Sequence, residues 1–206
     1  MEKTDKFWDR MAKQFDKRAK HFEPPPVGKT KKHLNANDIV LDYGCATGTV
    51  AIEIARNVRK VSGIDISSKM IDAAKRKANE SKIENIDFAQ SSIFHERNKT
   101  ESFNAILAFN ILHFLEDKKR IVQRINELLK PGGVFISATV CMGEKTFLNT
   151  IQFLLFFPLI KLEIIPYMNF LKISELKDLI TNGNFQIIEI ERMKNPSYYF
   201  IVAKKI

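Results

Sequence analysis

Cysteine, signal-peptide character and long apolar runs are all scarce in this 206-residue chain. Its two cysteines, Cys45 and Cys141, cannot build a disulfide framework, which favours a reducing compartment. The first twenty residues are dense in charge and contain no apolar signal-peptide segment. The most apolar stretch, within residues 147–171, is short and is interrupted by prolines and charged side chains, which argues against a transmembrane span. These absences predict a cytoplasmic protein.

Internal repeats and low-complexity tracts are also absent. The composition, 45% hydrophobic and 28% charged, is typical of a globular protein rather than a disordered or fibrous one. A chain of this length can bury a substantial core and corresponds to one ordinary domain.

Basic residues exceed acidic ones, 33 against 24, which gives a formal net charge of +9. Such an excess raises nucleic acid or an anionic surface as partners. The basic residues are spread along the chain instead of forming one run, so we predict a solvated surface and no nucleic-acid partner. Peripheral contact with a membrane stays open, as does the choice between a monomer and a homodimer.

The N-terminal residues 3–21 carry an apolar residue at every fourth position, which predicts an amphipathic helix. These positions are Phe7, Met11, Phe15 and Ala19. The prolines at 24–26 end the pattern, because proline has no amide donor and disfavours a helical residue before it. We expect this segment to be an arm laid over the main domain.

From Asp38 onward, short apolar runs alternate with helical patterns, which predicts a doubly wound α/β domain. The expected strands are Ile39–Asp42, Lys60–Asp65, Ile86–Ala89, Phe103–Phe109, Val134–Thr139, Phe185–Arg192 and Tyr198–Ala203. The expected helices are Thr49–Asn57, Ser67–Ser81, Asp117–Lys130 and Ser174–Asn182. Ligands of such sheets bind outside the carboxyl ends of the strands, where the strand order reverses.

Two features follow the first two strands. Asp42 begins a loop with glycine at 44 and 48, and a helix follows at once. The glycines allow a sharp backbone turn, and the start of the helix has free amides that could bind a ligand. A dinucleotide fingerprint would also need glycine at 46 and 49, which ranks a nicotinamide cofactor last. Asp65, at the end of the second strand, could accept both hydroxyls of a ribose.

Together, Asp42-x-Gly44-x-x-x-Gly48, Asp65 and Leu129-Lys130-Pro131-Gly132-Gly133 resemble the motifs of class I S-adenosylmethionine-dependent methyltransferases. The resemblance implies a Rossmann-like, mostly parallel seven-stranded sheet with an antiparallel last strand. It implies S-adenosyl-L-methionine as the cofactor and S-adenosyl-L-homocysteine as its product. The implied divisions are a helical arm (1–35), a cofactor-binding core (36–142), a helical lid insertion (143–173) and a C-terminal helix and hairpin (174–206).

The resemblance also assigns cofactor contacts to individual residues. The loop would hold the methionine moiety, Asp65 the ribose, and Ile66 and Met70 the adenine, while Asn110 would lie near the sulfonium. The implied set is Asp42, Gly44, Cys45, Ala46, Gly48, Asp65, Ile66, Met70, Ser92, Ile93, Asn110 and Phe15. Ala46 replaces the usual glycine and Ser92 the usual acid, which keeps a non-catalytic cofactor-binding module as an alternative.

The methyl acceptor is predicted from two segments. Residues 110–114 lack the Asn-Pro-Pro-Tyr pattern of base and amide methyltransferases and resemble the small-molecule subgroup that includes quinone-biosynthesis C-methyltransferases. His113 is a candidate general base, with packing as the alternative. The apolar insertion predicts a lid for a small, lipophilic acceptor, with Phe153, Phe156 and Phe157 as its contacts; extra core or a dimer contact is the alternative. An RNA methyltransferase remains a rival because of the +9 charge, and no metal site is expected.

Overall fold

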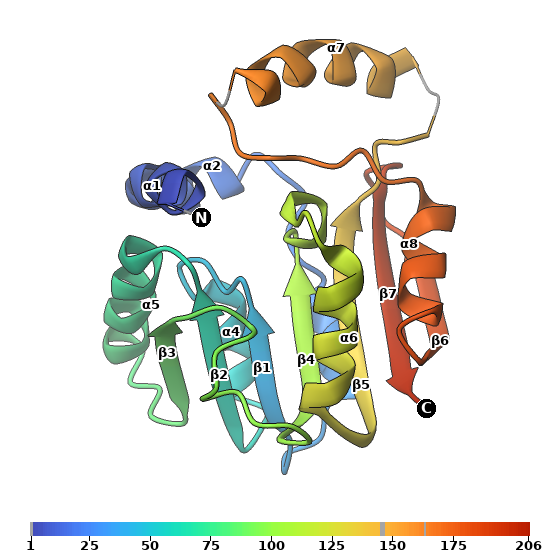
Figure 1. The fold of residues 1–206 in the computed structure, drawn as a ribbon. Coiled ribbons are helices and arrows are strands. Elements are labelled where there is room, and N and C mark those ends of the chain that lie inside the picture. The colour runs from blue at the N-terminus through green and yellow to red at the C-terminus, as the bar shows by residue number, and fades with distance from the viewer. Residues whose placement is uncertain (1, 145–146, 163) are drawn as a thin grey trace.

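A computed structural model describes residues 2–144, 147–162 and 164–206, and within them seven strands form one sheet in the order β3-β2-β1-β4-β5-β7-β6 (Figure 1). The strands are β1 (Ile39–Tyr43), β2 (Lys60–Asp65), β3 (Ile86–Gln90), β4 (Phe103–Phe109), β5 (Leu129–Val140), β6 (Phe185–Arg192) and β7 (Tyr198–Lys205). The first five are parallel, whereas β7 is antiparallel to both β5 and β6. This topology confirms the predicted fold class.

Helices cover both faces of the sheet (Figure 1). The helices α4 (Thr49–Ala55) and α5 (Ser68–Glu80) bury their apolar side chains on one face, and α6 (Lys118–Leu128) and α8 (Ile173–Thr181) bury theirs on the other. Each helix that follows a strand here packs back on the sheet, as right-handed crossovers between parallel strands do. The strand order reverses between β1 and β4, because β2 and β3 lie on one side of β1 while β4 and β5 lie on the other. Since β1 and β4 are parallel, their carboxyl ends lie at the same edge.

The segment from Leu129 to Gly133 differs from the prediction. It was expected to separate a helix from a strand at Val134, but β5 already begins at Leu129. The strand is irregular there: its register with β4 shifts between Phe103 and Ala105, and Gly132 adopts a left-handed φ of 73°. A glycine-bearing bulge thus lets the chain leave α6 and enter the sheet without a separate loop.

The N-terminal arm is broken where a continuous helix was predicted. It consists of α1 (Glu2–Met11), a single 3₁₀ turn η1 (Ala12–Gln14) and α2 (Phe15–Ala19). The break bends the chain so that α1 lies over α5 while α2 leads towards the sheet (Figure 1). Two short elements, α3 (Val27–Thr30) and the 3₁₀ turn η2 (Lys31–His33), then lead into β1.

The apolar insertion forms a helix, α7 (Phe147–Lys161), beyond the carboxyl edge of the sheet (Figure 1). The arm lies beyond the same edge, on the opposite side of the molecule from α8. Within the described residues, no helix combines the length and the apolar character that crossing a bilayer requires.

Candidate functional site

The loop after β1 turns sharply into α4. The amides of Gly44 and Cys45 both donate to the carbonyl of Ile64 on β2, at 2.8 and 3.0 Å. Three of its residues have left-handed backbones, with φ of 73° at Gly44, 47° at Ala46 and 76° at Gly48. The loop therefore follows a path that glycine adopts freely, but an alanine occupies its centre.

The carboxylate of Asp65 holds this loop against the start of α5. One of its oxygens accepts the amide of Ala46 at 3.0 Å, and the other accepts the amide of Ser67 at 2.9 Å. A carboxylate oxygen can accept more than one hydrogen bond, so each retains capacity for a ligand hydroxyl. Burial raises the pKa of this carboxyl group, while the backbone amides oppose that shift.

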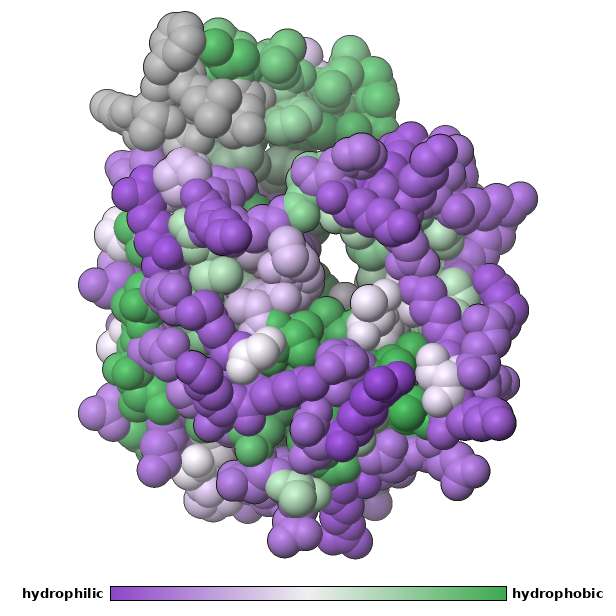
Figure 2. Space-filling view, turned by 180° about the vertical axis from the view of Figure 1, so that it is seen from behind, coloured by the Kyte–Doolittle hydropathy of each residue, from purple (hydrophilic) through white to green (hydrophobic). Residues whose placement is uncertain are grey.

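Two further predicted segments meet the loop and Asp65. The amide of Ser91 donates to the carbonyl of Asp65 at 2.9 Å, which brings residues 91–93 to the same edge. At Gly44, a Cβ atom would lie 2.3 Å from Cδ1 of Ile111, so the turn after β4, which includes Asn110, touches the loop. The space-filling view shows an opening below the arm, between it and the body of the molecule (Figure 2).

Asp42 is the unusual group of this site. It is buried, and its Oδ2 atom has no hydrogen-bond partner among the described residues. Loss of hydration, and to a lesser degree the nearby charge of Asp65, raise the pKa of Asp42 to about 7. A cationic ligand group beside the loop would satisfy this oxygen, as an ammonium group does with a carboxylate.

The loop glycines lie against protein side chains. A Cβ atom at Gly44 would meet Ile111, and one at Gly48 would meet Phe88 and Ala74. The glycines thus permit close packing beneath the loop. A ligand would meet the exposed side of the loop backbone.

Other predicted contacts are differently accessible. Cys45, Met70 and Ile93 are buried, with 6%, 1% and 1% of their surface exposed, and their contact with the cofactor stays a prediction. Ile66, Ser92 and Phe15 are half-buried and lie closer to solvent. Asn110 takes a left-handed φ of 54°, which asparagine tolerates better than most residues.

The arm is attached to the site by two carboxylates that the sequence analysis did not identify. Asp16 accepts the hydroxyl of Thr47 at 2.6 Å and pairs with Lys77 at 2.6 Å. Asp9 accepts the hydroxyl of Ser67 at 2.5 Å. Their seven-residue spacing on the polar side of the predicted helix was the available signal.

Trp8 extends the arm across the opening. Its ring meets that of Phe114, after β4, edge to face with centroids 5.1 Å apart. Phe114 belongs to η3 (Leu112–Phe114), the turn that also carries His113. The arm therefore joins the β1–β2 side of the edge to the β4 side, which encloses the candidate site.

His113 is buried, and desolvation lowers its pKa to about 4. The ring is therefore neutral near physiological pH, and its Nδ1 atom has no partner among the described residues. Its backbone carbonyl accepts the amide of Asn169 at 2.7 Å, which connects the segment after α7 to this turn. Its role as a base remains a prediction.

The lid candidates divide between two sides of α7. Phe156 is half-buried, together with Leu159 and Ile160, which share one helical stripe. Phe157 is 50% exposed, and the side chain of Phe153 lies outside those that the structure describes. No described side chain of α7 is fully buried, which favours a lid or a dimer contact over extra core.

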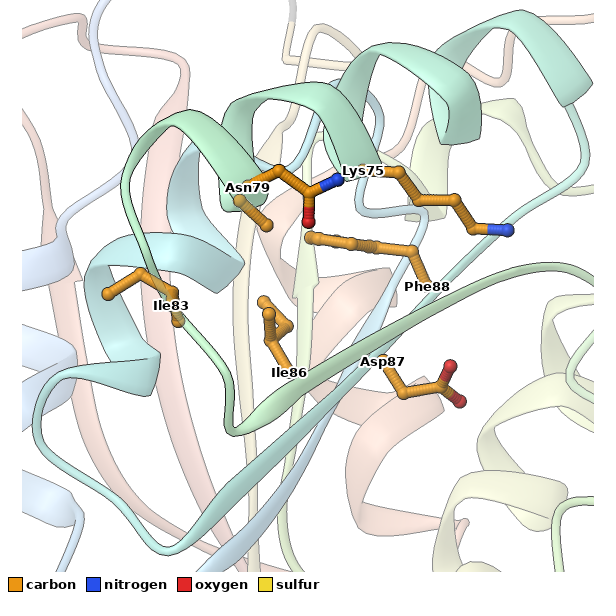
Figure 3. A pocket seen from close by; sticks show the side chains of 7 residues that line it. Lys75, Asn79, Ile83, Ile86, Asp87 and Phe88 are labelled. Atoms are coloured by element: carbon orange, nitrogen blue, oxygen red, sulfur yellow. The ribbon is translucent and has the colours of Figure 1, made fainter.

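Two surface hollows lie elsewhere. One, of about 240 Å³, lies between α5 and β3 and is lined by Lys75, Asn79 and Phe88 among others (Figure 3). The second, of about 220 Å³, lies at the amino edge near His33 and Gly132. Neither contains a residue predicted to bind the cofactor. Among the described residues, no group of three or more His, Cys, Asp or Glu could hold a metal ion.

A family model described as a methyltransferase domain matches residues 34–155. The chain belongs to this methyltransferase family. The match covers the loop, Asp65, the turn after β4 and most of α7, so the predicted class I methyltransferase resemblance is confirmed.

Known proteins agree with this assignment. The ubiquinone biosynthesis O-methyltransferase of Coxiella burnetii is 28% identical over 152 residues, which are 73% of this chain and 64% of that protein. The chain thus spans less than two thirds of this relative. A methyltransferase structure from Methanosarcina mazei has a TM-score of 0.72 at 21% identity, covering 90% and 99% of the two chains. The [4+2]-cyclase SpnF has a TM-score of 0.71 at 16% identity, covering 87% and 80%.

Ala46→Gly is expected to stabilise the protein by about 1 kcal/mol, because it removes the strain of a left-handed alanine. Chemical denaturation measures the change. Ala51→Gly, within α4, is the matched control and is expected to destabilise, since its backbone is helical. A destabilised Ala46→Gly variant would show that the loop conformation is not strained.

For the ligand-free protein, we compare the change in unfolding free energy caused by Asp42→Asn at pH 8 with the change near pH 4. The change at pH 8 is expected to be more stabilising by up to about 4 kcal/mol. The folded-state pKa of about 7 lies above the value of about 3.9 of an unperturbed aspartate, so the wild-type protein loses stability as pH rises between these values. His113 titrates in both proteins and cancels in the comparison. A difference in unfolding free energy that does not change with pH would contradict the assignment.

Proposed function

We propose that the chain transfers the methyl group of S-adenosyl-L-methionine to a hydroxyl group of a small, lipophilic acceptor. The buried, unpartnered oxygen of Asp42, beside a loop fixed by Asp65, carries the cofactor part of this proposal. The methionine moiety has an ammonium group that suits Asp42, and the ribose has a diol that suits Asp65. A nicotinamide dinucleotide offers the loop no such cation.

Each group of residues has a separate task in this proposal. Asp42 and the loop hold the amino-acid end, Asp65 holds the ribose, and Ile66 and residues 91–93 border the adenine. When bound, the cofactor supplies a methyl group on a sulfonium that leaves as a neutral thioether. The protein mainly aligns the acceptor with that methyl group, and such alignment reaches effective molarities of about 10⁵–10⁸ M.

The acceptor class rests on two observations. The Coxiella burnetii relative is named for O-methylation in ubiquinone biosynthesis, which favours an oxygen nucleophile on a lipophilic ring. One side of α7 is apolar and half-buried, and we take it to face the body of the protein. It carries Phe156, Leu159 and Ile160. We therefore assign residues 143–173 as an acceptor lid between the cofactor-binding core and the C-terminal hairpin.

A hydroxyl acceptor must lose its proton during transfer. His113 lies in the turn after β4, is neutral, and has an unpartnered Nδ1 atom that could accept it. Its low pKa makes it a weak base while the site is empty. Acceptor binding that places a polar group near the ring would raise this pKa towards the range useful for general base catalysis.

A cofactor-binding module without methyl transfer is the second candidate. The left-handed Ala46 and the neutral Ser92 favour it, because both weaken contacts that the family usually makes. The SpnF structure is named a cyclase despite its similar fold, so the fold alone does not decide the reaction. Binding with no turnover of any phenolic acceptor would support this candidate.

Asp65→Ala is expected to weaken S-adenosylhomocysteine binding at least about tenfold, since each charge-assisted hydrogen bond contributes about 1.5–3 kcal/mol. Transfer of a radiolabelled methyl group to a catechol should fall in parallel. Asp87→Ala, which removes an exposed carboxylate on β3, is the matched control and should change neither quantity. Unchanged affinity of the Asp65 variant in calorimetry would refute the ribose assignment.

Phe156→Ser is expected to raise KM for a lipophilic acceptor about tenfold while leaving cofactor affinity within about twofold. Phe22→Ser is its control, because that ring is 73% exposed and lies in the arm connection. Steady-state kinetics and thermal unfolding separate the two roles of Phe156. Truncation of a core phenylalanine would cost about 3–5 kcal/mol, and a loss of that size with lost cofactor binding would exclude the lid.

A further inference from the structure

The outward side of α7 carries apolar side chains that an acceptor lid does not explain. Ile151, Leu154 and Leu155 are 39%, 65% and 62% exposed, and Leu162, directly after the helix, is 69% exposed. Their spacing gathers them on one side of the helix, adjacent to the half-buried side that carries Phe156, Leu159 and Ile160. No charged residue occurs from Phe147 to Ile160. Exposed apolar patches of this kind mark interaction surfaces in monomeric proteins.

Acidic and basic side chains of the arm beside α7 lie on different sides of it. Three of its acidic side chains contact the body of the protein: Asp9 bonds to Ser67, Asp16 to Thr47 and Lys77, and Glu23 accepts the amides of Lys194 and Asn195. From α1 to Lys20, the basic side chains that the structure describes are exposed. They are Lys6, Arg10, Lys13, Lys17, Arg18 and Lys20. The arm therefore presents a positive outer face.

Both features lie at the same end of the molecule. The ribbon places α7 and the arm beyond the carboxyl edge of the sheet (Figure 1), and the space-filling view shows the apolar helix next to the hydrophilic arm (Figure 2). A surface that approaches this end would meet apolar side chains from α7 and positive charge from the arm.

We propose that the outward stripe of α7 and the basic face of the arm together form a docking surface for an anionic phospholipid bilayer. At 15 residues, α7 spans about 22 Å, so it would lie in the plane of the interface with its outward stripe among the acyl chains. The basic arm would contact the headgroups, where anionic lipid attracts each lysine or arginine. The carboxyl edge of the sheet, with the candidate site, then faces the lipid.

Charge complementarity favours a bilayer over other occupants. A symmetric pair of copies joined through α7 would bring two positive arms towards each other, which opposes association. Nucleic acid would match the arm but would leave the apolar stripe in water. An anionic bilayer satisfies both features at once, and this surface does not depend on the methyl-transfer proposal.

Flotation of the full chain with vesicles tests the surface. Vesicles containing about one third phosphatidylglycerol in phosphatidylcholine should retain the protein, and phosphatidylcholine alone should retain it at least about tenfold less. Leu154→Ser/Leu155→Ser should lower the partition coefficient at least about tenfold. Lys13→Gln/Lys17→Gln should lower it by about fivefold per lysine, and high salt should have a similar effect.

Ile188→Ser/Ile190→Ser is the matched control, because these β6 side chains are 49% and 40% exposed away from α7. It should bind vesicles like the wild-type protein. Circular dichroism of every variant checks that the fold is kept. Three results would overturn the proposal: no retention by anionic vesicles, retention unaffected by the α7 variant, or a lipid-free dimer in light scattering that this variant dissociates.

Discussion

The carboxylate of Asp65 is the interaction on which the candidate site depends. It accepts the amide of Ala46 from one segment and the amide of Ser67 from another, so it fixes the loop after β1 relative to α5. The Ser67 hydroxyl also caps α5 by accepting the amide of Met70, and it donates to the carboxylate of Asp9 in the arm. The hydrogen-bond network thus extends to the N-terminal arm. Loop, helix and arm are thereby held together before any ligand is present, which lowers the entropy cost of binding.

This preorganisation leaves two unfavourable features in place. Asp42 is buried without a partner for one oxygen, and Ala46 holds a left-handed backbone. Both cost stability in the empty protein, and strained or unpaired groups of this kind concentrate at binding sites. In the arm, by contrast, Asp9, Asp16 and Glu23 bond to the body, while the described basic side chains from Lys6 to Lys20 are exposed. Local charge orientation, not the net charge of +9, therefore shapes this end of the molecule.

Much of the fold could be predicted because it follows local patterns. The bounds of β2, β4 and β6 agree with the apolar runs, and the loop, Asp65 and the turn at 110–114 meet as parallel-strand topology requires. The break in the arm and the bulged start of β5 could not be predicted, since tertiary packing decides both. The side chains that face Gly44 and Gly48 come from Ile111, Phe88 and Ala74, which are distant in sequence. The solvent exposure of the site residues could not be predicted from the sequence either. Met70 is buried, although its motif position suggested a ligand contact.

A structure of the chain with S-adenosylhomocysteine would show directly whether Asp65 binds the ribose. We expect the ribose hydroxyls within hydrogen-bond distance, about 2.6–3.2 Å, of the Asp65 carboxylate, and the ammonium group beside Asp42. Ile66 should border the adenine. A bound ligand whose ribose lies away from Asp65 would contradict this assignment, as would a ligand bound at either of the two surface hollows.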